Sequence, residues 1–347
     1  MNKILQLLDE DFVCQYFSRE LLPLYPDFLE IVFVKIKPYK KLIWHTTYHV
    51  VIAFEVKFLN KATTQENIFL VCSAHSEEPR ENVFRVLNFL QNRGLANDWI
   101  DIPKPLFFSP EFNGVFYTGL KGENILRQVR VGGDIAAKKI ALVAKLFAAL
   151  HSLEIKDAPN FNPQSAKIAT VIPGLESILR EMSRRYNGVY DEDLRKFYDH
   201  FISKEAEFSK FEKNLALIHG DAHLENIIDT GEGRLGIIDF ADLCHGDFAR
   251  DLGTFLQQLE YRATSVKTGL RNPEENARFK KIFLDEYIKA RGLVLDENLK
   301  ERIKLYYDWT MLRTATYFFL KAEVEIERAE VLFARVRASF KSANLVI

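Results

Sequence analysis

Two apolar runs that each end in an acidic residue constrain this chain more than any other feature. Residues 215–218 are Leu-Ala-Leu-Ile and lead into a turn that contains Asp221, and residues 235–238 are Leu-Gly-Ile-Ile and lead into Asp239. The first run has too few polar atoms for an exposed loop, so it predicts a buried strand or strand end. Each acid is therefore expected where the chain leaves an apolar segment.

A hairpin is predicted between the two acids. Residues 226–239 contain two apolar segments separated by a turn that is rich in glycine and charge. A four-residue loop at 231–234 would place Asn226 directly opposite Asp239, and a shorter loop would offset the two by one or two residues. In either case an amide oxygen and a carboxylate converge, with Asp221 at the mouth of the same hairpin.

The chemistry of these three side chains matches phosphoryl transfer. An ionised carboxylate at the edge of an apolar core is costly unless it is paired or coordinated. Mg²⁺ takes one or two protein oxygens together with phosphate oxygens and water, and would satisfy Asp239. In phosphoryl transfer an Asp accepts the proton of the substrate hydroxyl, and a later Asn and Asp hold the metal. We therefore expect Asp221 to be the catalytic base, and Asn226 and Asp239 to be metal ligands.

Three motifs between residues 217 and 253 carry this pattern further. They are His219-Gly220-Asp221-x-x-x-x-Asn226, Ile238-Asp239-Phe240 and Gly246-Asp247-x-x-x-Asp251-Leu252. Together they resemble the aminoglycoside phosphotransferase and choline kinase family, which are small-molecule kinases with a protein-kinase-like fold. Leu120-Lys121-Gly122 is similar to the family's inter-lobe linker, and residues 141–153 resemble its long C-lobe helix. The resemblance covers residues 30–320, and its specific part is the segment 217–253.

The resemblance implies an α+β fold with two lobes. A small N-lobe at residues 1–118 would contain an antiparallel β-sheet and bind the nucleotide. A larger, mainly helical C-lobe at residues 119–347 would carry the catalytic loop and the substrate site. The family pattern also implies that His219 and Asp251 support the catalytic loop, while Asp251 fits equally well as the N-cap of the apolar helix that follows it. His223 receives no role.

The nucleotide site is where the sequence departs from the family. By resemblance the nucleotide base would lie against the linker, so Thr118 and Leu120 are candidate nucleotide-binding residues. Residues 1–93 contain no glycine, so a glycine-rich phosphate loop is absent. Residues 62–103 contain no lysine, and Cys72 is expected where the third strand of the family carries its phosphate-binding lysine.

Other basic side chains are candidates to replace that lysine. We prefer Lys57 on the second strand, because a neighbouring strand can project its ammonium group into the same cleft. The alternatives are Lys35, Lys37, Arg80 and Arg85. Glu81 is either the helix acid that pairs with such a lysine or a solvated acid that stabilises the start of a helix.

Hydrophobic periodicity predicts a β-rich half followed by a helical half. Strands are expected at residues 31–37, 44–59, 68–73, 106–108 and 115–117, which would form a five-stranded N-lobe sheet. Helices are expected at 1–29 with breaks at its prolines, and at 79–93, 134–153, 191–207, 251–263, 275–291 and 297–340.

Composition excludes several other classes of protein. Hydrophobic residues make up 48% and charged residues 27% of the 347 residues, which is usual for a globular protein. The net charge of −1 gives no argument for attraction to nucleic acid or to a membrane. Three cysteines without paired spacing favour a reducing compartment over a disulfide framework or a zinc site. The N-terminus lacks a signal-peptide layout, so we expect a cytoplasmic location.

Two functions fit the sequence. The first is a Mg²⁺-dependent phosphotransferase that moves the γ-phosphate of ATP or GTP to a hydroxyl of a small molecule, such as an aminoglycoside, an amino alcohol or a sugar-like compound. The second is a catalytically weak or inactive kinase-fold protein with a nucleotide-binding or regulatory role. The missing lysine and glycines favour this second function. The acceptor stays open, because the aromatic run at 306–319 fits either a cation–π cage or a helix core. The acids at 191–193 and 323–330 fit either attraction of a polycation or a solvated helix face.

Overall fold

The chain folds into two compact units. The structure, a computed structural model, describes residues 2–78, 80–210, 215–263 and 273–340. Unit 1 comprises Met1–Glu123 together with Ile228–Ala241, and unit 2 comprises Asn124–Ile227 together with Asp242–Ile347. The hairpin at 228–241, which the sequence pattern placed in the helical half, thus belongs to unit 1. The lobe boundary after residue 118 stays a prediction.

A five-stranded antiparallel sheet is the centre of unit 1, as predicted. Its spatial order is β1 (Phe28–Ile43), β2 (Tyr48–Asn60), β3 (Gln65–His75), β6 (Gly114–Thr118) and β5 (Pro105–Ser109). A smaller sheet has the order β4 (Ile100–Asp101), β10 (Arg234–Ile237), β9 (Ile227–Gly231) and β7 (Glu123–Asn124). The predicted start of the second strand at residue 44 was wrong, because the Trp44 N–H donates to the Thr47 carbonyl at 2.8 Å and closes a turn.

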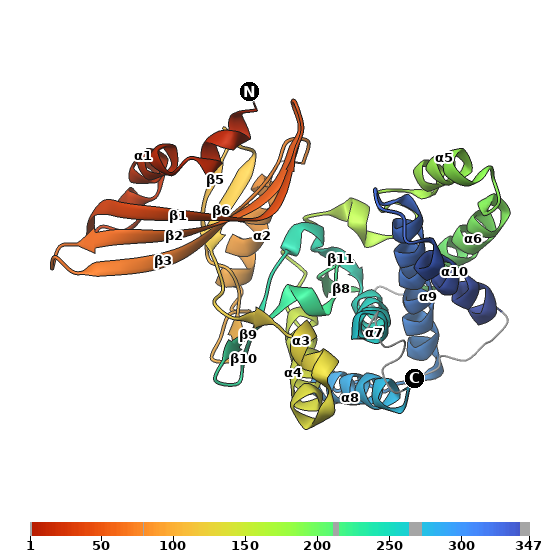
Figure 1. Cartoon of the computed structure of the whole chain (residues 1–347). Coiled ribbons are helices and arrows are strands. Elements are labelled where there is room, and N and C mark those ends of the chain that lie inside the picture. Colours follow the sequence, from red (N-terminus) through yellow and green to blue (C-terminus); the bar gives the residue numbers. More distant parts are fainter. Residues whose placement is uncertain (1, 79, 211–214, 264–272, 341–347) are drawn as a thin grey trace. The chain divides into compact units, whose positions relative to one another are not determined.

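Helix α1 (Glu10–Glu20) covers one face of the five-stranded sheet (Figure 1). Short 3-10 helices at Lys3–Leu8 and Leu22–Leu24 flank it. Asp9 caps its N-terminus by accepting a hydrogen bond from the Phe12 N–H at 2.8 Å. The even-numbered side chains of β2 from Val50 to Phe58 are buried in the same hydrophobic core as α1.

The other face of this sheet, which we call the distal face, consists of the odd-numbered residues of β2 and their cross-strand partners. Side chains alternate along a strand, so residues paired across strands share a face. Cys72 pairs with Ile52 and Phe116, lies on the α1 face and is fully buried. Ser73, opposite Val51, is the neighbouring β3 side chain that belongs to the distal face, and the placement of Cys72 at the family's lysine position stays a prediction.

Strand β1 forms one end of the sheet order and contains a bulge. Its register shifts between Pro38, which pairs with Ile52, and Lys40, which pairs with Val51, so Tyr39 is an extra residue. The bulge places Lys40 on the distal face beside Val51. In an unbroken register Tyr39 would occupy this position and Lys40 would belong to the α1 face.

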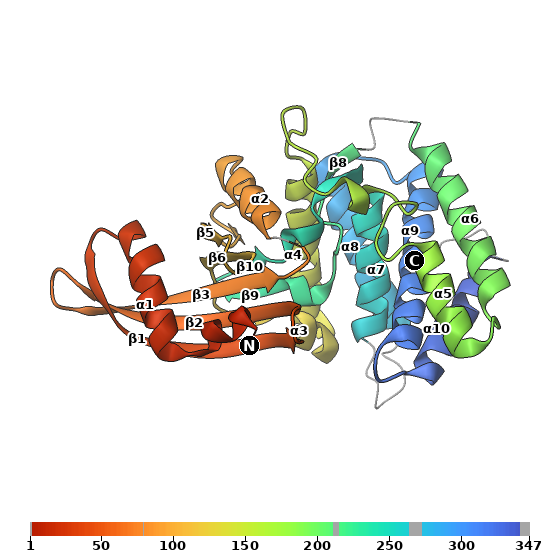
Figure 2. The same ribbon diagram turned by 90° about the horizontal axis from the view of Figure 1, so that it is seen from above.

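Unit 2 is mainly helical. Its helices are α3 (Leu126–Val131), α4 (Gly133–His151), α5 (Leu175–Tyr186), α6 (Asp191–Phe208), α7 (Ala249–Ala263), α8 (Pro273–Arg291), α9 (Glu297–Leu320) and α10 (Ile326–Ser339). Helix α7 packs against both α8 and α9, and α8 also packs against α4 (Figure 2). The single helix predicted at 297–340 was wrong, because the backbone is extended at Lys321 and divides it into α9 and α10.

The buried strand predicted before Asp221 is confirmed. It is β8 (Leu215–Ile218), which pairs antiparallel with β11 (Cys244–Asp247). The aromatic run of α9 belongs mainly to the helix core, since Tyr306, Tyr307, Trp309, Phe318 and Phe319 are buried and Tyr317 is exposed. Among the residues that the structure describes, no helix combines the length and apolar character needed to span a membrane.

Candidate active site

The turn after β8 requires a glycine. Gly220 has a φ of +83°, and a Cβ added there would lie 2.6 Å from the backbone oxygen of Asp242. Because Cys244 of β11 pairs with Ile218 of β8, the chain before β11 lies directly against this turn. The backbone on either side of Gly220 therefore has little freedom to move.

Asp251 binds this turn from α7. Its Oδ2 accepts hydrogen bonds from the His219 N–H at 2.6 Å and from Nε2 of His151 at 3.0 Å. Its Oδ1 accepts one from the Gly220 N–H at 3.0 Å. Helix α7 begins at Ala249, so Asp251 lies within the first turn and is not the N-cap. The sequence pattern did not identify His151, which is 100 residues away in the chain and also contacts the Tyr287 hydroxyl at 2.8 Å through Nδ1.

The Asp251 carboxyl group is ionised although it is buried. Burial raises its pKa, but the hydrogen bond and charge of His151 and the charge of His219 lower it more, so the pKa lies below its ordinary value. The three hydrogen bonds that Asp251 accepts replace those that water would donate to an exposed carboxylate. The role of His219 and Asp251 in supporting catalysis stays a prediction.

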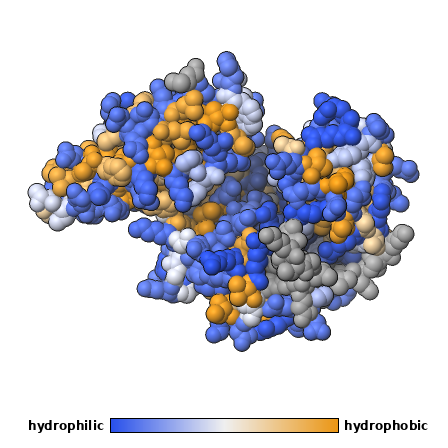
Figure 3. Space-filling model, in the orientation of Figure 1, coloured by the Kyte–Doolittle hydropathy of each residue, from blue (hydrophilic) through white to orange (hydrophobic). Residues whose placement is uncertain are grey.

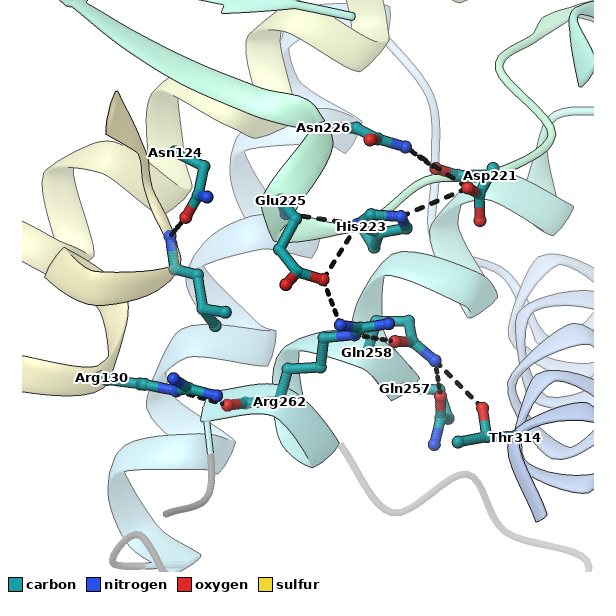
Figure 4. Close-up of polar contacts among 11 residues, drawn as sticks. Asn124, Arg130, Asp221, His223, Glu225, Asn226, Gln257, Gln258, Arg262 and Thr314 are labelled. Carbon is teal, nitrogen blue, oxygen red and sulfur yellow. Dashed lines mark hydrogen bonds and ion pairs between the residues drawn. The ribbon is translucent and has the colours of Figure 1, made fainter. Parts of the chain in front are cut away.

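Asp221 lies beyond the turn and is half exposed (Figure 4). Its N–H donates to Nδ1 of His219 at 3.3 Å, and its Oδ2 lies 3.2 Å from Nε2 of His223. His223 Nδ1 accepts from the Glu225 N–H at 3.2 Å, so Nε2 is the nitrogen that carries the proton and donates to Asp221. No role was assigned to His223 from the sequence, because its contact with Asp221 depends on the ring orientation.

The surroundings of Asp221 favour its ionised form. Partial desolvation by the surrounding protein raises its pKa, but the hydrogen bond and charge of His223, and the charges of His219 and Arg313, lower it by more. The pKa of Asp221 is thus below its ordinary value, and the group is a carboxylate at neutral pH. Such a group can accept a hydrogen bond from an approaching hydroxyl.

Asn226 ends the 3-10 helix Leu224–Asn226 and is buried. Its Nδ2 donates to the backbone oxygen of Asp221 at 3.0 Å and approaches Oδ2 of the same residue at 3.4 Å. In the described part of unit 2, both side-chain hydrogen bonds of Asn226 are thus made by its nitrogen. Its amide oxygen is the atom left to bind a cation, as the prediction requires.

A chain of polar side chains continues from this loop to α7 and α9 (Figure 4). Glu225 pairs with Arg262, whose Nε donates to Gln258 Oε1 at 2.8 Å. Nε2 of Gln258 donates to the Thr314 hydroxyl at 3.1 Å. Arg130 also donates from Nε to the backbone oxygen of Arg262 at 3.0 Å. Apart from the i,i+4 contact between Gln258 and Arg262, these contacts join residues far apart in the sequence, so no local pattern predicted them.

Asp239 belongs to unit 1 and has an unusual backbone conformation. Its φ is +62°, which is uncommon for a residue other than glycine and is concentrated at functional sites. Lys40 and Tyr117, both in unit 1, interact electrostatically with its carboxylate. The register that would place Asn226 opposite Asp239 stays a prediction, as do their roles as metal ligands.

Side chains that each offer a single oxygen donor suit Mg²⁺ better than a transition metal. Among the described residues there is no group of three or more His, Cys, Asp or Glu side chains that could hold a metal ion. Zinc or iron sites need such groups, whereas Mg²⁺ keeps several waters and phosphate oxygens and needs one or two protein oxygens. The amide oxygen of Asn226 and the carboxylate of Asp239 are ligands of this kind.

The remaining predicted nucleotide-binding residues all belong to unit 1. Lys57 pairs with Phe33 and Asn67 on the distal face. Glu81 is the exposed first residue of α2 (Glu81–Asn92). The Thr118 N–H donates to the Lys104 carbonyl at 2.9 Å, and the Gly119 N–H donates to Phe69 at 2.8 Å. The N–H groups of Thr118 and Gly119 are thus used within unit 1, and Leu120 is the next residue of the linker.

Comparison with known proteins identifies the family. The model of the phosphotransferase enzyme family (APH) matches residues 52–290, which is more than half of the chain. The chain belongs to this family. None of the curated proteins matches it significantly. The match contains all three motifs, and includes Asp221, Asn226 and Asp239.

Solved structures of this family share the kinase-like fold. An ethanolamine kinase from Plasmodium vivax superposes with a TM-score of 0.57 at 16% identity, covering 88% of this chain and 82% of that one. A spectinomycin phosphotransferase in complex with ADP and spectinomycin gives 0.55 at 12% identity, with 97% and 96% covered. The choline kinase LicA from Streptococcus pneumoniae gives 0.54 at 15% identity, with 95% and 98% covered. The predicted α+β, protein-kinase-like fold is confirmed.

Proposed function

We propose that this protein is a cytoplasmic, Mg²⁺-dependent kinase that transfers the γ-phosphate of ATP or GTP to a hydroxyl group of a small molecule. The observation that carries the proposal is the setting of Asp221. It is a half-exposed carboxylate that His223 and nearby charges keep ionised, and Asn226 is hydrogen-bonded to it. Phosphoryl transfer needs this combination of a base and oxygen ligands.

Asp221 accepts the proton of the acceptor hydroxyl as that oxygen attacks the γ-phosphorus, and the bond from this phosphorus to the β–γ bridging oxygen breaks to release ADP or GDP. The hydrogen bond from His223 Nε2 holds Oδ2 of Asp221, so Oδ1 is the oxygen that would meet the hydroxyl. Asp251 keeps the backbone before Asp221 in place through the N–H groups of His219 and Gly220. Correct positioning of the base is the main contribution of these residues, because phosphoryl transfer requires little covalent chemistry from the protein.

Asn226, through its amide oxygen, and Asp239, through its carboxylate, would hold Mg²⁺. When bound, the metal neutralises charge that develops on the phosphate oxygens. The nucleotide base would lie against the linker, where Thr118 and Leu120 are the candidate contacts, and the Thr118 and Gly119 N–H groups are already used by backbone acceptors.

A second candidate is a weak or inactive kinase-fold protein that only binds nucleotide. The observation that favours it is the distal face of β3, which presents Ser73 and not a lysine. The phosphate groups of a nucleotide would then depend on cations from elsewhere in the chain, or would bind poorly.

Calorimetric titration of ATP and GTP, with and without Mg²⁺, tests both candidates. We expect binding that requires Mg²⁺ in the wild type and is lost in Asp239→Ala. A panel of amino alcohols, aminoglycosides and sugars should then reveal ADP release that Asp221→Asn reduces by about 10²–10⁴-fold while thermal unfolding stays unchanged. Absence of nucleotide binding, or equal turnover in Asp221→Asn, would refute the kinase.

A further inference from the structure

In unit 1, Lys40 interacts electrostatically with Asp239 and belongs to a group of four basic side chains, none of which lies at the expected position on β3. They are Lys40 of β1, His49 of β2, His75 of β3 and Arg80, the residue before α2. We infer that Lys40 and Arg80, with His49 holding the lysine in place, bind the phosphate groups of the nucleotide in this kinase. This inference rests on the proposed function and names the residues that replace the missing lysine.

The bulge in β1 is what gives Lys40 this position. Because Tyr39 is an extra residue, Lys40 pairs with Val51 and shares the distal face with His49, which pairs with Leu42 and His75. Bulges next to functional sites commonly redirect one side chain in this way. The lysine therefore comes to the distal face from the first strand.

His49 fixes the ammonium group of Lys40. Nζ of Lys40 lies 3.2 Å from Nε2 of His49. Burial, followed by the charges of Lys40, Arg80 and His75, lowers the pKa of His49 to about 4, so its ring is neutral at neutral pH and accepts the hydrogen bond from Lys40. The His49 ring also packs edge-on against His75, with 4.7 Å between ring centroids.

His75 is oriented by backbone donors. Its Nδ1 accepts hydrogen bonds from the N–H groups of Glu77 at 3.2 Å and Glu78 at 3.0 Å. Nε2 must therefore carry the proton of the neutral ring, which makes it a further donor in the group. Burial lowers the pKa of His75, and the charges of Arg80 and Lys40 lower it further against the opposing charges of Glu78 and Glu77.

Arg80 is largely buried and incompletely satisfied. Its side chain is 11% exposed, and in the described structure its buried Nε has no hydrogen-bond partner. One terminal nitrogen lies 3.6 Å from the Glu78 carboxylate, which is itself 66% exposed to solvent. A buried donor such as this Nε is costly to the fold when it lacks an acceptor, and a phosphate group is a ligand whose geometry matches a guanidinium.

The charges around Lys40 and Arg80 suit a nucleotide polyphosphate that binds together with Mg²⁺. The acidic groups that interact with Lys40 are Asp239 and the exposed Glu78. Asp239 is the proposed Mg²⁺ ligand, so a bound cation would take up its negative charge and leave two protein cations for the phosphates. Tyr117 adds no charge, because burial, and then the charge of Asp239, raises the pKa of its hydroxyl.

Lys57, the residue preferred from the sequence, lies far along the same face. It is six residues from Val51 on β2, which is about 20 Å at 3.3 Å per residue. Lys40 pairs with Val51 itself. The electrostatic interaction of Lys40 with Asp239 therefore favours Lys40 over Lys57.

Calorimetric titration with Mg²⁺-ATP, ADP and adenosine tests the inference. We expect Lys40→Ala to weaken ATP and ADP binding by about 10- to 100-fold, the effect of one lost charge-assisted hydrogen bond. Adenosine affinity should stay within about twofold, because adenosine has no phosphate, and Lys40→Arg should restore most of the ATP affinity. Lys41→Ala, one residue away and opposite Val50 on the other face, is the matched control and should bind like the wild type.

Two results would overturn the inference while leaving the kinase intact. The first is that Lys40→Ala binds ATP as tightly as the wild type. The second is that Lys57→Ala, and not Lys40→Ala, loses ATP binding. An equal loss of ATP and adenosine binding in Lys40→Ala would indicate a structural role and would also refute it. Failure of the wild type to bind ATP would instead refute the proposed function, and the inference with it.

Discussion

Replacing Asp251 by Asn should destabilise unit 2 by an amount that its contacts determine. The carboxylate accepts three hydrogen bonds, two at Oδ2 and one at Oδ1. In the variant the amide oxygen can take the place of Oδ2, but the amide nitrogen then faces the Gly220 N–H. One buried donor loses its acceptor, at a cost of about 1–3 kcal/mol, and the other two bonds each lose about 1 kcal/mol with the charge. We expect a loss of about 3–5 kcal/mol, comparable to breaking a buried ion pair.

The measurement is thermal and urea unfolding of the wild type and Asp251→Asn. For domains of 150–250 residues, about 1 kcal/mol shifts the Tm by roughly 2–4 °C, so a decrease of about 10 °C is expected. Asp285→Asn is the control, because Asp285 is 59% exposed and its i,i+4 pair with Lys281 is a surface contact. That pair contributes about 0.5 kcal/mol or less.

The pH dependence provides a second test of the same contacts. Burial raises the pKa of Asp251, but His151 and His219 lower it more, so the folded-state pKa lies below the ordinary value of 3.8. The contribution of the carboxylate is therefore complete above about pH 4 and is lost as the pH falls below that value. The stability difference between wild type and variant should be constant from pH 5 to 7 and narrow below pH 4. A loss of unfolding free energy below about 1 kcal/mol in Asp251→Asn would contradict this reasoning. So would a difference between variant and wild type that stays the same at all pH values.

Two further changes have expected outcomes. Gly220→Ala should lower the free energy of unfolding by more than the roughly 1–2 kcal/mol that a positive φ costs, because its Cβ would meet the Asp242 backbone. Gly231→Ala, with a φ of +91° and open space around it, should cost only that amount. Equal urea midpoints for the two variants would contradict this expectation. Burial raises the pKa of Glu260, but the charges of Arg335 and Lys280 lower it to about 2, so Glu260→Gln should lose on the order of 3 kcal/mol at pH 7. The ordinary value is 4.5, so this loss should vanish as the pH falls from about 4.5 towards 2, and a constant loss in acid would refute the pairing.

Hydrophobic periodicity within single segments predicted those strands and helices that depend on one segment and on the face that it buries. The alternation in β2 and β3 and the helical spacing in α4 each depend on one segment and on the side that it buries. The strand before Asp221 was predicted for the same reason, since four apolar residues in a row require a core. The break between α9 and α10 was missed because no glycine or proline occurs at 321–325 to indicate it.

Contacts between distant residues could not be predicted from the sequence. The carboxylate of Asp251 needs His151, and only the packing of α4 near α7 brings the two together. The position of Lys40 depends on one extra residue in β1, and a bulge is defined by the pairing partner and not by the strand's own sequence. For this reason the sequence does not point to Lys40 and favours Lys57, which lies on a strand with a clear pattern.

The edge position of β1 has a consequence for association between chains. A 16-residue edge strand offers a long row of backbone groups to a strand from another molecule, and β1 also exposes Leu29, Val32, Phe33, Tyr39 and Leu42. Hydrophobic residues are visible over unit 1 in Figure 3. Lys35, Lys37, Lys40 and Lys41, with Pro38 between them, are the kind of residues that protect such an edge. The bulge adds to this protection by breaking the straight edge, so the irregularity that redirects Lys40 also keeps β1 from becoming a template for aggregation.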